Sequence, residues 1–189
     1  MPNPLYLIRI GTKDPRFEPS LELMNNSFPT DERRHDDELR GLVESSPIFA
    51  FNVIMADGER AGLITTWNFG KFIYVEHFAI EPRLRGHGLG IRALRTLQET
   101  SALPLVLEVE PQHTSPDAAR RIKFYQRAGL NLWATPYTQP SYGLGKAPLP
   151  MALMTYQLEE TPECTQIVKA ILYKNVYKVK TIDIPHALF

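Results

Sequence analysis

Short apolar stretches, each bounded by turn residues, divide the first part of the chain into candidate strands. Four stretches read as strands, at residues 5–10, 48–55, 61–68 and 72–80. The tripeptide Ala56-Asp57-Gly58 is typical of a hairpin turn, and Gly70 marks a second turn. The last three strands are therefore expected to form an antiparallel run with short connections.

Helical spacing characterises the segment between the first two candidate strands. Residues 16–44 are predicted to form two helical pieces that break at Pro29. Thr30 is a suitable cap for the second piece, and Asp31 and Glu32 would lie in its first turn, where the helix dipole favours acids.

Beyond Pro82 the pattern changes to strands separated by helices. A Gly-rich stretch leads into a helix with its apolar positions at 91–97, and Ser115-Pro116-Asp117 is a strong start signal for a second helix. Further strands are predicted at 105–110, 151–158 and 177–182, a long loop at 134–150 and a last helix at 161–174. The order predicts an α/β fold with one sheet and helices on both faces.

Composition limits the classes of protein. Of 189 residues 43% are apolar and 22% are charged, which is ordinary for one soluble domain. Basic and acidic residues number 21 each, so zero net charge disfavours a nucleic-acid partner. A single cysteine, Cys164, excludes an intrachain disulfide and a Cys-based zinc cluster. Without a signal peptide or a run of roughly 18 apolar residues, we expect a cytoplasmic, metal-free protein that does not span a membrane.

The Gly-rich stretch RLRGHGLG, residues 83–90, is the main candidate for a binding site. It lies between a strand and a helix, where the first helical amides lack partners and attract phosphate. Two common phosphate-binding patterns do not match. A dinucleotide fingerprint would need glycine at Ile91, and the Gly-Lys-Ser/Thr of a Walker loop is absent.

The pattern that does fit is R-x-x-G-x-G, from Arg85 to Gly90, and here the chain resembles the GNAT superfamily of acyl-CoA-dependent N-acetyltransferases. Two neighbouring segments extend the resemblance. FAIEP, residues 78–82, precedes the loop, and IKFYQRAGL, residues 122–130, is similar to the second signature of the family. Leu107-Glu108-Val109 lies between the two motifs. The resemblance covers residues 48–135 well.

The resemblance implies a fold and a coenzyme. The expected fold is a mixed, mainly antiparallel sheet of about six to seven strands, splayed between the fourth and fifth strands, in one domain over residues 1–189. Its core would be residues 48–158, and residues 159–189 would form a C-terminal extension. The implied coenzyme is acetyl-CoA, with these residues as its binding site: Phe78, Ala79, Ile80, Arg85, Gly86, His87, Gly88, Leu89 and Gly90.

The implied activity is transfer of an acetyl group to a primary amine by direct attack in a ternary complex. Tyr125 matches the family's general acid, although its spacing alone would also suit a core tyrosine. Glu108 and Glu76 are the candidates for the general base, and each could instead be a solvated carboxylate at a sheet edge. Strand parity places Glu76 with Phe78, and puts His77 on the opposite face unless a bulge intervenes.

Two departures from the family pattern keep a second reading open. Many members carry Asn seven residues before the tyrosine and Ala four before it, where this chain has Ala118 and Arg121. The missing Asn leaves acyl-donor choice open. It also leaves room for a non-catalytic acyl-CoA-binding regulatory module on the same fold.

The acceptor-binding residues are expected in the segment 16–44 and the loop 134–150. Glu32 belongs to a densely charged run that could form an acidic lip or a solvated helix start. Tyr137 and Tyr142 could form one wall of the acceptor pocket. The acceptor could be a small-molecule amine or the amine of a peptide or protein, and a homodimer also stays open.

Overall fold

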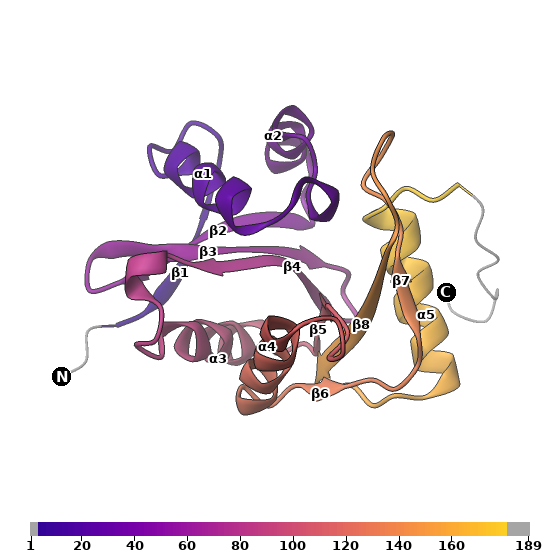
Figure 1. Ribbon diagram of the computed structural model, residues 1–189. Coiled ribbons are helices and arrows are strands. Elements are labelled where there is room, and N and C mark those ends of the chain that lie inside the picture. Colours follow the sequence, from indigo (N-terminus) through magenta and orange to yellow (C-terminus); the bar gives the residue numbers. More distant parts are fainter. Residues whose placement is uncertain (1–3, 181–189) are drawn as a thin grey trace.

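One sheet organises the computed structural model, which describes residues 4–180 (Figure 1). Its strands are β1 (Tyr6–Ile10), β2 (Phe49–Ala56), β3 (Glu59–Asn68), β4 (Ile73–Ile80), β5 (Leu105–Val109), β6 (Asn131–Leu132), β7 (Tyr137–Gln139) and β8 (Leu149–Tyr156). Their order is β1-β2-β3-β4-β5-β8-β6, and β7 pairs separately with β8. Among the described strands β4 and β5 form the one parallel pair.

The predicted mixed, mainly antiparallel α/β fold is confirmed, with eight strands in place of six or seven. The additional strands are β6 and β7, of two and three residues. Neither is long enough to produce a recognisable alternation of apolar and polar residues. β7 lies within the segment predicted as a long loop. Its residues 137–139 pair antiparallel with residues 149–151 of β8.

Helices cover both faces of the sheet (Figure 1). They are α1 (Phe17–Ser27), α2 (Asp36–Ser45), α3 (Leu89–Ser101), α4 (Pro116–Arg127) and α5 (Pro162–Asn175). α1 and α2 lie on one face and α3 and α4 on the other, whereas α5 lies beside β7 and β8. None of the helices within residues 4–180 is both long and apolar enough to cross a membrane.

Two local predictions differ from the structure. Thr30 does not cap α2: it begins a 3-10 turn, Thr30–Glu32, and the helix starts six residues later at Asp36. Of the strand expected at 177–182, residues 177–180 form no strand, and the remainder lies outside the described residues. The extended segment between the 3-10 turn and α2 carries Arg34 into the protein interior, where the side chain is buried.

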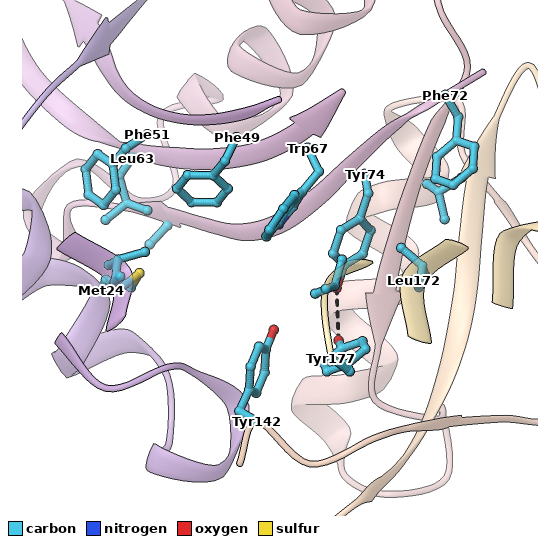
Figure 2. Packing of buried hydrophobic residues seen from close by; sticks show 14 of the residues in the cluster. Met24, Phe49, Phe51, Leu63, Trp67, Phe72, Tyr74, Tyr142, Leu172 and Tyr177 are labelled. Atoms are coloured by element: carbon cyan, nitrogen blue, oxygen red, sulfur yellow. Dashed lines mark hydrogen bonds between the residues drawn. The ribbon is translucent and has the colours of Figure 1, made fainter. Parts of the chain in front are cut away.

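The hydrophobic core has one part on each side of the sheet. On the α1 and α2 side it is rich in aromatic residues, and Figure 2 shows Phe49, Trp67 and Tyr74 along adjacent strands. Tyr177, from the chain after α5, packs into the same cluster. The second part lies under α3 and α4 and consists mainly of aliphatic residues. Tyr177 therefore packs against the middle strands of the sheet, close to Tyr74 of β4.

β4 and β5 diverge as the family resemblance predicted. They pair only where Ile73, Tyr74 and Val75 face the residues 105–107. From Glu76 to Ile80 the edge of β4 that faces β5 is unpaired, while β5 continues along β8 to Val109. The splay therefore leaves exposed backbone groups in the middle of the sheet.

A β-bulge at Glu76 corrects the predicted strand parity. Thr65 pairs with His77 and Thr66 with Val75, so Glu76 is the extra residue of β4. Glu76 consequently contacts Trp67 on the aromatic side of the sheet, whereas Phe78 packs in the aliphatic cluster. The prediction that Glu76 and Phe78 share a face is wrong because the bulge reverses the alternation.

Candidate active site

The space between the diverging strands is a cavity of about 680 Å³. Its wall contains residues from β4, β5, β7, β8, α3 and α4 and from the chain after α1. Most of the predicted site residues line it: Glu32, Glu76, Phe78, Ala79, Ile80, Arg85, Gly86, Gly88, Leu89, Gly90, Glu108, Tyr125 and Tyr142. Residues of the Gly-rich loop and of the helix that carries Tyr125 thus line the same cavity.

The Gly-rich loop forms one end of the cavity wall. Gly86 and Gly88 have positive φ values of 81° and 75°, and a Cβ atom on either would meet nothing within 4 Å. The loop backbone is therefore open to a bound molecule, and the unpaired first amides of α3 follow directly. Arg85 Nε donates a 3.0 Å hydrogen bond to the carbonyl of Ile80, which ties the loop to the end of β4.

The next glycine, Gly90, serves packing rather than conformation. A Cβ atom there would lie 2.9 Å from the Phe124 ring, which stacks against Phe78 with 6.2 Å between ring centroids. The small residue thus lets α3 approach α4 and β4 closely. His87 does not line the cavity, and its Nδ1 lies 3.4 Å from the carbonyl oxygen of Leu84.

Three tyrosine hydroxyls converge on the carboxylate of Glu108. Tyr74 donates from 3.0 Å and Tyr177 from 2.5 Å to one oxygen, and Tyr137 donates to the other. Burial disfavours the charged form and is only partly offset by these hydrogen bonds, so the pKa of Glu108 is raised to about 7. Glu108 therefore changes its protonation state close to neutral pH.

Glu76 lies on the same cavity wall in a different electrostatic environment. Its side chain has no exposed surface, and it accepts hydrogen bonds from Arg34, from Trp67 at 2.9 Å and from Tyr142 at 3.0 Å. Burial alone would favour the neutral acid, but the adjacent Arg34 guanidinium outweighs it and lowers the pKa of Glu76. This carboxylate remains ionised and paired.

Arg34 joins three distant parts of the chain at this point. Besides Glu76, its guanidinium donates a 2.7 Å hydrogen bond to the carbonyl of Val176. It also lies 5.5 Å from the centre of the Trp67 ring and 4.9 Å from that of Tyr142. Figure 2 shows Tyr142 with its hydroxyl directed toward the strand that carries Trp67. The guanidinium thus has both charge and aromatic partners in a buried setting.

His77 is held as a neutral ring in the same region. Nε2 lies 3.0 Å from the carbonyl oxygen of Glu32, so this nitrogen carries the proton, and Nδ1 faces the hydroxyl of Thr65 at 3.2 Å. Burial lowers the pKa of His77, although Glu76 acts in the opposite direction. Both ring nitrogens are engaged within the protein, so His77 is a structural residue.

The helix signals around Tyr125 are correct. Ser115 caps α4 by accepting a 3.0 Å hydrogen bond from the amide of Ala118, and Gly129 follows the helix with φ 87°. Tyr125 is 8% exposed and faces the cavity, and burial raises its pKa to about 12. Its hydroxyl therefore keeps its proton at neutral pH.

Two further predicted residues lie at the edge of this arrangement. Glu32 lines the cavity, and burial together with the charge of Glu110 raises its pKa. Tyr137 does not line the cavity and reaches the site through its hydrogen bond to Glu108. Among residues 4–180, no group of three or more His, Cys, Asp and Glu side chains is placed to hold a metal ion.

Sequence reasoning missed four residues that complete the site: Arg34, Tyr74, Gln139 and Tyr177. Tyr74 lies in the predicted strand 72–80, two residues before Glu76. Side-chain alternation along the strand could therefore have placed it on the same face as Glu76. The others lie in segments without a regular pattern. Only the tertiary fold brings Gln139 to the cavity wall and brings Arg34 and Tyr177 to Glu76 and Glu108. Arg34 gave no signal, because an arginine in a charged run normally points to solvent.

Comparison with known proteins matches the sequence and the fold of this chain to one protein family. The profile of the "Acetyltransferase (GNAT) family" matches residues 17–130. A protein of Bacteroides thetaiotaomicron assigned to the GNAT family is 39% identical, with a TM-score of 0.88 over 93% of this chain and 99% of that one. The matched fold therefore extends beyond the profile into the C-terminal strands and α5.

More distant proteins share parts of the chain or the fold alone. YjbC of Bacillus subtilis (strain 168), named as an acetyltransferase, is 26% identical over 107 residues. The match covers 56% of this chain and 53% of YjbC, so the chain spans about half the length of that relative. A GNAT acetyltransferase of Elizabethkingia anophelis, solved with acetyl-CoA bound, is 12% identical with a TM-score of 0.54 and covers 82% of this chain and 98% of that one.

Proposed function

Because the chain belongs to the acetyltransferase (GNAT) family, we propose that it transfers the acetyl group of acetyl-CoA to a primary amine by direct attack in a ternary complex. The observation that carries the proposal is one cavity with two proton-handling groups. Glu108, with a pKa of about 7, and Tyr125, with a pKa of about 12, line the same space beside the Gly-rich loop.

The cavity wall fits acetyl-CoA. The open backbone at Gly86 and Gly88 and the free amides at the start of α3 suit a pyrophosphate, and Arg85 adds a positive charge. Phe78, Ala79 and Ile80 present the unpaired edge of β4, whose amide and carbonyl groups suit the amide-containing pantetheine arm. Leu89 and Gly90 complete this side of the wall.

The residues of the chain would handle two protons during the reaction, for which acetyl-CoA supplies a reactive acetyl thioester. The carboxylate of Glu108 accepts a proton from the amine as the nitrogen–carbon bond forms. The hydroxyl of Tyr125 donates a proton toward the sulfur as the carbon–sulfur bond breaks. With a pKa of about 7, Glu108 can accept a proton near neutral pH, and with a pKa of about 12, Tyr125 still carries the proton that it has to donate.

Of the two carboxylates, Glu108 is the better general base. Glu76 has three hydrogen-bond donors, and its charge is neutralised by Arg34, so it attracts a proton weakly. Glu108 also has three donors, but all come from neutral tyrosines and no cation offsets its burial. We therefore assign Glu76 a structural role, in which it holds Arg34 and Tyr142 at the cavity.

The acceptor would enter from the side of the cavity formed by Glu32, Tyr142 and the β7–β8 segment. Glu32 is partly exposed and its carboxylate can attract a protonated amine. Both small-molecule amines and peptide amines fit this description. Ala118, at the position of the missing family asparagine, is buried and does not line the cavity.

The test begins with a calorimetric titration of acetyl-CoA and continues with an assay of CoA release over a panel of amines. The proposal predicts binding in the micromolar range and release that depends on the amine. Binding without release for any amine would favour the non-catalytic acyl-CoA-binding module. Absence of binding would remove the coenzyme assignment itself.

A further inference from the structure

Gln139 is a buried polar side chain on the cavity wall whose amide nitrogen has no protein partner. The residue is 2% exposed, and its Nε2 forms no hydrogen bond with any of residues 4–180. Two other buried polar side chains of the wall are engaged, since Tyr142 donates to Glu76 and Glu108 accepts from three tyrosines. Gln139 thus has donor capacity that the protein itself does not use.

The fold places this donor next to the proposed general base. Tyr137 and Gln139 are alternate residues of β7, so their side chains lie on the same face, about 7 Å apart along the strand. The hydroxyl of Tyr137 reaches Glu108. Because Gln139 and Glu108 both line the cavity, a bound molecule can direct its amine to Glu108 and another polar group to the amide of Gln139.

The unpaired amide of Gln139 limits which ligands the cavity can bind. Buried amide groups are almost always hydrogen-bonded, and a site with an unpaired donor rejects ligands that lack the matching acceptor. Glu32 and Glu108 on this wall are acidic. The charge of Arg34 is already balanced by Glu76, Arg121 of the same wall is paired with Glu110, and Arg85 belongs to the Gly-rich loop. Because a ligand carboxylate would be repelled here, a neutral oxygen is the better partner.

We propose that the acceptor is a primary amine that also carries a neutral hydrogen-bond-accepting oxygen, such as an amide carbonyl, and that Gln139 donates to this oxygen while the amine faces Glu108. This inference rests on the proposed acetyltransferase function. It assigns Gln139 to acceptor specificity and narrows the acceptor to amino amides, including the amino terminus of a peptide.

The test compares primary amines that differ in the group at the opposite end of the molecule from the amine. The probes are ω-amino amides with one to four methylene groups, alkylamines of equal length, the corresponding ω-amino acids, and a tripeptide amide. We expect kcat/KM to be about 10-fold higher for the best amide than for its alkylamine, which corresponds to one hydrogen bond of about 1.4 kcal/mol. The tripeptide amide distinguishes a peptide acceptor from a small amide.

Gln139→Met keeps the length of the side chain and removes its hydrogen bonds. In this variant the preference for the amide should fall to within about twofold. The matched control is Thr138→Val on the same strand, since Thr138 is exposed and lies outside the cavity wall. This control should retain the wild-type preference.

The failure of this inference and the failure of the proposed function give different results. Equal turnover of amides and alkylamines, a preference for amino acids, or an unchanged preference in Gln139→Met would each overturn the role of Gln139 and leave the activity intact. Calorimetry with CoA present adds a readout independent of turnover. Tight binding of an amide to wild type but not to Gln139→Met, without acetylation, would support the subsite and contradict the proposed reaction.

Discussion

Tyr177 donates a 2.5 Å hydrogen bond to Glu108, which is 69 residues away in the sequence. Its hydroxyl also lies 3.2 Å from that of Tyr74, which binds the same carboxylate oxygen (Figure 2). Tyr177 and Tyr137 both lie beyond residue 130, where the family profile ends. The C-terminal third of the chain therefore supplies two of the three hydrogen-bond donors to the proposed base.

Replacement of Tyr177 by Phe should move the pH dependence of the reaction. Tyr177 donates to the charged form of Glu108, so its loss should raise the pKa of that carboxyl above about 7. The base is active when ionised, so the acidic limb of kcat/KM should move to higher pH, by about one unit. The groups facing Glu108 are Tyr74, Tyr137 and, through its charge, Glu76.

Tyr173→Phe is the control for this shift. Tyr173 lies on α5 and donates to the carbonyl of Thr138 instead of to Glu108. Its variant should keep the wild-type limb. A limb that stays in place in Tyr177→Phe would mean that Glu108 is not the group titrating in the profile.

The pair of Arg34 and Glu76 should show strong coupling in stability. Arg34→Met leaves a buried carboxylate without its cation, which costs about 3–5 kcal/mol in the free energy of unfolding. Adding Glu76→Gln should recover part of this loss. Full recovery is not expected, because Arg34 also binds the carbonyl of Val176. Urea denaturation of the two single variants and the double variant measures the coupling, and purely additive losses would show that the pair does not act as a unit.

Much of this fold could be predicted from local patterns, and the active-site environment could not. The Ser115 cap and the Gly-rich loop are local signals, and the structure has the helices α4 and α3 at these places. The bulge at Glu76 depends on how β3 and β4 pair, so strand alternation gave the wrong face. Tyr177 reaches Glu108, and Gln139 reaches the cavity wall, only through the packing of distant segments, which no spacing in the sequence encodes.

Arg85→Ala should weaken binding of acetyl-CoA by about 1–3 kcal/mol, the scale of a hydrogen bond to a charged group. Arg85 lies on the cavity wall beside the open loop backbone. His87→Ala is the matched control within the same loop, since His87 does not line the cavity. Calorimetric dissociation constants compare the two, and an equal loss in both variants would argue against a direct contact from Arg85.

Tyr125→Phe should lower kcat by about 10²–10⁴ with little effect on folding or on the KM for acetyl-CoA. The variant keeps the buried ring and removes only the hydroxyl, which matters as the thiolate leaves. Tyr156→Phe offers a control tyrosine that does not line the cavity. A Tyr125→Phe enzyme with wild-type kcat, under conditions where chemistry limits the rate, would leave Tyr125 as a packing residue.

Acetyl transfer by direct attack in a ternary complex is tested most directly by following both products of one reaction. The wild-type protein is mixed with acetyl-CoA, first alone and then with an accepted amine, while free thiol, N-acetylated amine and the intact protein mass are measured together. Direct attack predicts no acetylated protein in either mixture and, with the amine present, thiol and N-acetyl product in a one-to-one ratio. Acetylation of the protein before the amine is added would contradict direct attack, and bound acetyl-CoA that no amine can discharge would contradict the enzyme itself.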